Sequence, residues 1–176
     1  STGSPFLIPY QPAGNHPEQI TIWDDTCLGL HVSTAADEWF SRQLNVPCRL
    51  MYMPDHSHRA VDSKYSPFGT LTSFSDAYPF LTISQETLDD LNSRLPLPIP
   101  MDRFRPNIVF TGGEPYAEDK LAHFIINGIH FYGVKLCGRC NIPGIDQETA
   151  VSSKEPVRTL AAYRRKNTYL CLGQNL

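Results

Sequence analysis

The stretch AHFIINGIHFYGVKL, residues 122–136, decides the class of fold. Two apolar, aromatic-rich runs flank the dipeptide Asn127-Gly128. Asparagine and glycine tolerate the positive φ angles of a type I′ turn, which joins two antiparallel strands most directly. The stretch therefore predicts a β-hairpin over residues 122–136, and with it a fold in which sheets dominate.

Outward from the hairpin, short apolar runs bounded by prolines or polar residues predict further strands. These runs are Gln19–Trp23, Cys48–Met53, Pro79–Ile83, Asn107–Thr111 and Tyr169–Leu172. Apolar residues at helical spacing predict helices over Ser33–Leu44, from the cap Ser84 to Leu95, and over Pro156–Arg165. Between these elements, Asp55–Thr72 is expected to be a long polar loop. The sum is a mixed α/β, sheet-dominated fold, expected to be a β-barrel with about three peripheral helices.

The composition excludes several classes of protein. Of 176 residues, 41% are hydrophobic and 19% are charged, so the chain can bury a core and is not expected to be disordered. A net charge of −3 argues against a general nucleic-acid-binding protein, which needs a basic face. No apolar run approaches the ~20 residues that span a bilayer, and no secretory leader is visible. We therefore expect no membrane span and a cytoplasmic location.

The cysteines support the same compartment. There are five of them (Cys27, Cys48, Cys137, Cys140 and Cys171), an odd number that does not suit a disulfide framework. A chain of this length does not need disulfides to be stable. The thiols are therefore expected to be reduced, as is usual in the cytoplasm.

The sharpest chemical motif is Cys137-Gly138-Arg139-Cys140, directly after the predicted hairpin. Gly138 lets backbone amides approach an anion, and Arg139 favours the thiolate form of its neighbours, which is the metal ligand and nucleophile. The spacing alone leaves four alternatives open. They are half of a zinc site, a redox pair, a single thiolate for a soft metal, and two structural cysteines.

Two further segments carry polar groups at the mouths of predicted strands. Arg103-Phe104-Arg105-Pro106-Asn107 places a guanidinium and an amide where they could clamp a phosphate, and Pro106 is expected to hold Arg105 extended. Asp76 precedes the strand at Pro79, where a carboxylate could relay a proton or simply form a turn. His56 and His58 lie in the polar loop and are expected to be solvated rather than bound to a metal.

Taken together, these segments resemble the MOSC domain, the molybdenum-cofactor sulfurase C-terminal domain. The resemblance is to the subgroup that contains the mitochondrial amidoxime-reducing component and bacterial reductases of N-hydroxylated bases. Together the matching motifs are far more specific than any one alone. The matching stretches are Ser75–Leu95, Phe104–Gly112, Tyr116–Asp119, Val134–Asp146 and Lys154–Arg164.

The resemblance assigns roles within the cysteine motif. The second cysteine of the family's motif is its molybdenum ligand, so the resemblance implies that Cys140 holds the metal of a molybdenum-pterin cofactor (molybdopterin) and is catalytic. A soft thiolate suits such a metal. Gly138 and Arg139 would line the cofactor, with Arg139 facing its phosphate. Cys137 is expected to pack beside the cofactor without ligating the metal.

The resemblance assigns four more residues. Arg105 and Asn107 match the family's cofactor-binding arginine and asparagine. Asp76 matches a carboxylate near the metal, a second catalytic residue that would relay protons, and Ala77 lies beside it. The resemblance also implies a division of the chain: an irregular lead-in over 1–18, a segment over 19–70 that joins from an N-terminal β-barrel, and a MOSC core over 71–176. That core is expected to lack its last strand, so that the chain would be a fragment of a longer protein.

The function implied by the resemblance is the reduction of small N-hydroxylated compounds to amines, with electrons from a donor protein or domain. Two alternatives stay open. In the first, Cys140 carries a persulfide and hands sulfur to a metal-sulfur cluster or cofactor under assembly. In the second, the chain is a structural zinc or protein-interaction module.

Overall fold

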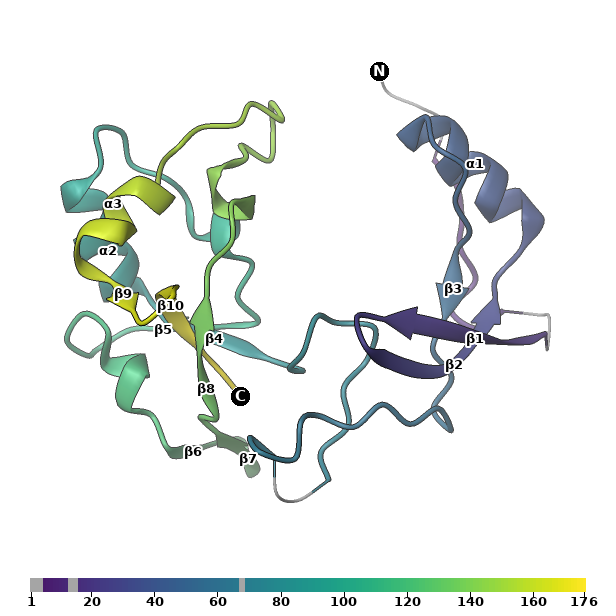
Figure 1. The fold of residues 1–176 in the computed structure, drawn as a ribbon, viewed down its shortest axis with the longest axis horizontal. Helices are drawn as coiled ribbons and strands as arrows, with labels where there is room; N and C mark the ends of the chain where they lie inside the picture. The colour runs from purple at the N-terminus through teal and green to yellow at the C-terminus, as the bar shows by residue number, and fades with distance from the viewer. Residues whose placement is uncertain (1–4, 13–15, 67–68) are drawn as a thin grey trace. The chain divides into compact units, whose positions relative to one another are not determined.

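Figure 1 shows the computed structural model of the chain, which describes residues 5–12, 16–66 and 69–176. The chain divides into two compact units. The first unit comprises residues 1–63 and 67–77, and the second comprises residues 64–66 and 78–176, so far as they are described. Within these described ranges, no helix has both the length and the apolar character needed to cross a membrane.

The first unit contains a three-stranded antiparallel sheet in the order β1-β2-β3. Its strands are β1 (Pro17–Ile22), β2 (Asp25–His31) and β3 (Met51–Tyr52). The predicted strand over Gln19–Trp23 corresponds to β1, but β2 was not predicted. The turn between them depends on Trp23, whose φ is 54°. Tryptophan rarely adopts this conformation, so the sequence carries no ordinary turn signal there.

The helix predicted at residues 33–44 is confirmed as α1 (Thr34–Leu44). The hydroxyl oxygen of Ser33 accepts a hydrogen bond from the backbone N–H of Ala36 at 3.1 Å, which caps the first turn. The helix ends at Asn45, which takes the left-handed conformation with φ 52°. Both ends of α1 therefore follow from local sequence.

The second unit is built on a five-stranded sheet in the order β5-β4-β10-β8, with β9 paired to β10. Its strands are β4 (Leu81–Ser84), β5 (Ile108–Phe110), β8 (Lys135–Gly138), β9 (Arg165–Lys166) and β10 (Tyr169–Asn175). The β4–β5 pair is parallel and the other pairs are antiparallel. In the described part of this unit the edge strands β5 and β8 do not pair with each other, so the predicted closed barrel is not formed there.

The hairpin predicted at residues 122–136 is confirmed as β6 (His123–Ile126) and β7 (Ile129–Tyr132). Asn127 and Gly128 have φ angles of 49° and 79°, as a type I′ turn requires. The hairpin is a separate two-stranded sheet, because residues 135–138 leave it and join the larger sheet as β8. The predicted segment therefore contains two structures rather than one.

Two helices and three short 3-10 turns complete the second unit. The helices are α2 (Gln85–Arg94), capped by Ser84, and α3 (Val157–Tyr163). The turns are η1 (Met101–Phe104), η2 (Ala117–Lys120) and η3 (Ile142–Gly144). The third helix is shorter than predicted, because Arg165 and Lys166 leave it and pair with β10 as β9.

The core of the second unit lies where α2 and α3 pack against β4 and β10 (Figure 1). Its buried members are Leu81, Ile83, Leu88, Leu91, Leu95, Phe104, Leu160 and Leu172. Gly173 lies in β10 with φ 84°, and a Cβ there would come within 2.8 Å of the Ile83 side chain. Glycine at this position therefore lets β10 bulge while it stays close to β4.

Replacing Leu91 by alanine tests this packing. Leu91 is fully buried in the core. We expect Leu91→Ala to lower the free energy of unfolding by about 2–5 kcal/mol, because it removes buried methyl groups and leaves a cavity. Urea denaturation measures the loss. Leu97 is 77% exposed, so Leu97→Ala is the matched control and should change stability by less than about 0.5 kcal/mol.

Candidate functional site

The two motifs singled out in the sequence of the second unit meet at the side chain of Arg139. Its guanidinium lies over the Phe104 ring, 5.2 Å from the ring centroid. Its Nη2 also donates a hydrogen bond to the Phe104 carbonyl oxygen at 3.3 Å. The Cys137–Cys140 motif and the residues at the end of η1 therefore form one site, although 35 positions separate Phe104 from Arg139.

The main chain of the cysteine motif is held by β10. Gly138 pairs with Cys171, and the Arg139 backbone N–H donates to the Leu170 carbonyl at 2.7 Å. A Cβ on Gly138 would lie 3.2 Å from the Tyr169 ring, so this glycine allows close packing against β10. The motif therefore leaves the sheet in a fixed direction just before Cys140.

The Arg139 guanidinium is a desolvated cation. Its Nε is buried and has no hydrogen-bond partner among the described residues. No carboxylate of the described ranges forms an ion pair with it. Burial lowers the pKa of Arg139, while the thiols of Cys137 and Cys140 act in the opposite direction, and an arginine remains charged under such conditions. A partly buried positive charge without a counter-ion favours the binding of an anion.

The two cysteines of the motif differ in exposure. Cys140 is exposed, whereas Cys137 is half-buried and packs against the hydrophobic core. All five cysteines of the chain are free thiols. Cys140 is thus the thiol of this motif that a bound group could reach.

The structure gives Arg105 and Asn107 different environments. Asn107 joins β4 to β5: its backbone N–H donates to the Leu81 carbonyl, and its Oδ1 accepts from the Leu81 N–H, each at 2.9 Å. The Asn107 side chain therefore already stabilises the sheet, and its Nδ2 is the donor left for a ligand. Arg105 is exposed and left-handed, with φ 54° and ψ 47°, so the extended conformation predicted for it is wrong. A following proline favours extended backbone, but Arg105 closes η1, and its backbone N–H donates to the Asp102 carbonyl at 3.0 Å. This local turn overrides the preference that Pro106 sets.

Arg103 has a role that sequence reasoning missed. Its Nη2 pairs with Asp146 Oδ2 at 2.6 Å, and its Nη1 donates to the Pro143 carbonyl at 3.2 Å. Pro143 belongs to η3, the turn that directly follows Cys140. Arg103 therefore ties η1 to the segment on the far side of the cysteine motif. Neither residue type nor spacing distinguishes it from the neighbouring Arg105.

Asp76 and Ala77 belong to the first unit, where both are exposed. The segment that leads to them is held by Arg59, which is only 4% exposed. The Arg59 guanidinium donates to the carbonyls of Ser73 (2.9 Å), Asp76 (3.0 Å) and Ser75, and its Nε pairs with Asp25 at 2.9 Å. The loop predicted at residues 55–72 thus contains the clamp for the segment with Asp76.

The histidines of the same loop lie on the surface of the first unit. His56 and His58 are exposed, as solvated histidines would be. Across the described ranges, no three residues among His, Cys, Asp and Glu gather in a way that could hold a metal ion. A closed structural zinc site, which takes four such ligands, therefore has no candidate among these residues.

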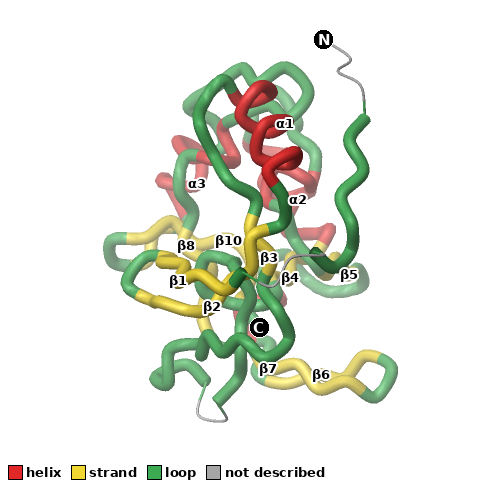
Figure 2. Tube along the Cα trace, turned by 90° about the vertical axis from the view of Figure 1, so that its right-hand side faces the viewer, coloured by secondary structure: helices red, strands yellow, loops and turns green. Residues whose placement is uncertain are grey.

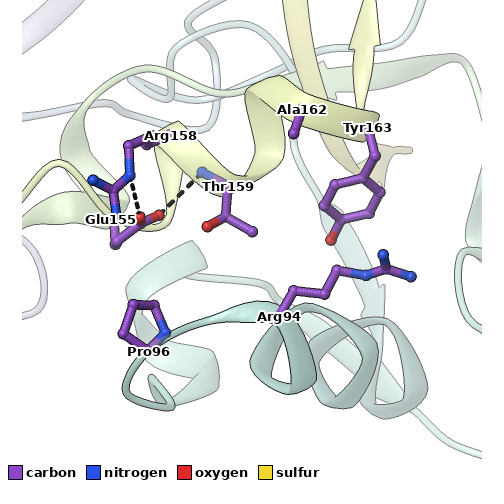
Figure 3. Close-up of a pocket in the computed structure, with 7 residues that line it drawn as sticks. All are labelled: Arg94, Pro96, Glu155, Arg158, Thr159, Ala162 and Tyr163. Atoms are coloured by element: carbon purple, nitrogen blue, oxygen red, sulfur yellow. Dashed lines mark hydrogen bonds and ion pairs between the residues drawn. The ribbon is translucent and has the colours of Figure 1, made fainter.

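A surface pocket of about 430 Å³ lies between α2 and α3 (Figure 3). Its two arginines are already paired: Arg94 with Asp90 at 2.8 Å and Arg158 with Glu155 at 2.7 Å. No predicted site residue lines it. The pocket therefore offers no uncompensated charge, in contrast to the surroundings of Arg139.

Removing the Arg59 side chain tests the clamp. In Arg59→Met the carbonyls of residues 73, 75 and 76 lose a donor, so we expect a loss of about 1–3 kcal/mol in stability. Hydrogen exchange should accelerate over residues 73–77. Arg42 is exposed on α1, and Arg42→Met should change neither property. Unaltered exchange in Arg59→Met would show that the clamp does not order this segment.

Comparison with known proteins identifies the family. The sequence profile of the MOSC domain matches residues 70–176. The chain is 35% identical over 165 residues to mitochondrial amidoxime-reducing component 1 of Mus musculus, which covers 90% of this chain and 48% of that protein. It is 33% identical over 178 residues to molybdenum cofactor sulfurase of Solanum lycopersicum, covering 90% and 21%. The chain thus spans about half, or less, of the length of these relatives, and it belongs to the MOSC domain family.

Proposed function

We propose that this protein binds a molybdenum-pterin cofactor and reduces N-hydroxylated compounds to amines, with electrons from a separate donor protein or domain. The observation that carries the proposal is Arg139, a partly buried cation with a buried, unpartnered Nε. It directly follows the last residue of β8 and precedes the exposed thiol of Cys140 in sequence. The names of the amidoxime-reducing relatives support the reaction.

The residues present fit such a cofactor. A phosphate would supply the negative charge and the acceptor oxygen that Arg139 lacks. The exposed thiol of Cys140, beside this guanidinium, is a soft ligand for molybdenum. Arg105 is exposed and Asn107 retains Nδ2, so both could donate to the polar edge of the cofactor. Arg139 would thus bind the phosphate of the cofactor, and Cys140 would bind its metal.

When bound, the cofactor would supply the two-electron redox chemistry at the nitrogen–oxygen bond. The overall conversion consumes two electrons and two protons for each N–OH group and yields an amine and water. The protein must therefore bind the substrate, orient its N–O bond and deliver protons.

In this proposal Cys140 holds the metal as a thiolate and Arg139 fixes the cofactor through its phosphate. Asp76 delivers a proton to the departing oxygen, because an exposed carboxyl can exchange its proton with water between turnovers. Arg59 does not touch the substrate. It is a positioning residue that holds the main chain around Asp76.

A second candidate function is persulfide transfer by Cys140. Its exposure and the similarity to molybdenum cofactor sulfurases favour this alternative. The sulfur atom would then be carried on Cys140 as a persulfide and passed to an acceptor thiol or metal. This function needs no bound molybdenum, which separates it from the first.

Metal analysis of the protein purified from a host that makes the cofactor tests the proposal. We expect about one molybdenum per chain in the parent and in Cys137→Ser, since Cys137 packs against the core. Cys140→Ser should lose the metal, because a hydroxyl is a poor ligand for it. Arg139→Met should retain less cofactor, measured as released pterin. Absence of molybdenum from the parent, together with a persulfide on Cys140, would replace the first function by the second.

Replacing Asp76 by asparagine tests the proton relay. We expect Asp76→Asn to retain molybdenum and to lower kcat about 100-fold, which is typical for the loss of a general acid. Asp24→Asn is the matched control, because Asp24 is another exposed carboxylate of the same unit. Steady-state kinetics with a hydroxylamine or amidoxime substrate over a range of pH provide the measurement. Equal rates for Asp76→Asn and the parent at every pH would remove Asp76 from the mechanism.

A further inference from the structure

The hairpin formed by β6 and β7 carries two imidazoles that face each other. His123 Nε2 and His130 Nδ1 are 2.9 Å apart, a hydrogen bond in which one nitrogen carries the proton and the other accepts it. Both side chains are exposed. The hairpin extends away from the five-stranded sheet (Figure 2), so a solute can approach the pair from water.

The pair is held in place before any ligand arrives. Strand register places His123 opposite Tyr132 and His130 opposite Ile125, and the type I′ turn fixes this register. The two imidazoles stack at 5.1 Å with 25° between their planes. His123 also stacks on Tyr132 at 4.7 Å. A ligand that used both nitrogens would therefore find them already close together.

We infer that His123 and His130 form a two-imidazole site for a divalent transition metal cation. Imidazole nitrogens lie about 2.0–2.1 Å from such metals, so two of them in adjacent, right-angled positions are about 2.9 Å apart. This is the separation of Nε2 and Nδ1. Each ring would turn its lone pair from the other ring toward the cation. The ring that donates the shared hydrogen bond would change tautomer, so that its proton moves to the other ring nitrogen and both imidazoles stay neutral.

The two imidazoles suit particular cations. A right angle between two ligands is typical of square-planar and octahedral centres, which Cu²⁺ and Ni²⁺ adopt. Among the described residues no third His, Cys, Asp or Glu completes the group. The remaining positions of the cation would therefore hold water or a ligand from another molecule, and binding is exchangeable rather than structural.

This site is distinct from the proposed cofactor site. The hairpin is a separate two-stranded sheet. The hydrogen bond and the ring contacts of its two histidines join residues of the hairpin itself. The site takes a free cation through nitrogen ligands, while Cys140 would take the metal of a pterin through sulfur. Its test therefore does not depend on the proposed function.

Titration calorimetry with Ni²⁺ tests the inference, because Ni²⁺ does not oxidise the free thiols. We expect one binding event that His123→Gln and His130→Gln each weaken at least ten-fold, because each substitution removes one of the two imidazole ligands. His56→Gln/His58→Gln is the matched control, since it removes two exposed histidines that lack this pairing. The control should keep the parent's affinity.

A second measurement locates the cation. Trace Cu²⁺ should broaden the backbone NMR signals of residues 123–132 before other signals, and His130→Gln should abolish this order. His130 alone suffices for the test if His123→Gln disturbs the stacking on Tyr132. Unchanged Ni²⁺ affinity in His130→Gln, or an equal loss in the His56/His58 control, would overturn the inference.

Discussion

The site of the second unit depends on the contact between Arg139 and Phe104. A guanidinium packed on an aromatic ring and bonded to a carbonyl has lost much of its water without gaining a negative partner. Such an arrangement is unfavourable in isolation and is maintained because β10 and η1 fix both of its sides. The fold therefore holds a positive charge without a counter-ion at Arg139, next in sequence to the exposed thiol of Cys140.

Much of the fold could be predicted from local sequence. The turn at Asn127-Gly128 and the cap at Ser84 depend on residues whose conformations are restricted by their own chemistry, and both are confirmed. Elements without such signals were missed or misjudged. Strand β2 follows a turn at Trp23, and the last helix gives way to β9 because of pairing with β10, which is a tertiary interaction.

The residues of the candidate site differ in whether the sequence points to them. Arg139 and Cys140 belong to a compact motif, so the sequence alone singles them out as candidates. Arg59 and Arg103 were missed because their partners are main-chain carbonyls and carboxylates far along the chain, up to 43 positions away for Arg103. Asn107 was found, but its role differs in part, since its side chain also completes the pairing of β4 with β5. Long-range polar partners leave no periodic signal in a sequence.

The grip of Arg59 on residues 73–76 has an evolutionary consequence. It recognises carbonyl oxygens, which every amino acid provides, and none of the side chains of this segment. Related proteins could therefore exchange the side chains around Asp76 while the path of the chain stays the same. The side chains of this segment can therefore change in evolution without a change in the main-chain contacts that hold it.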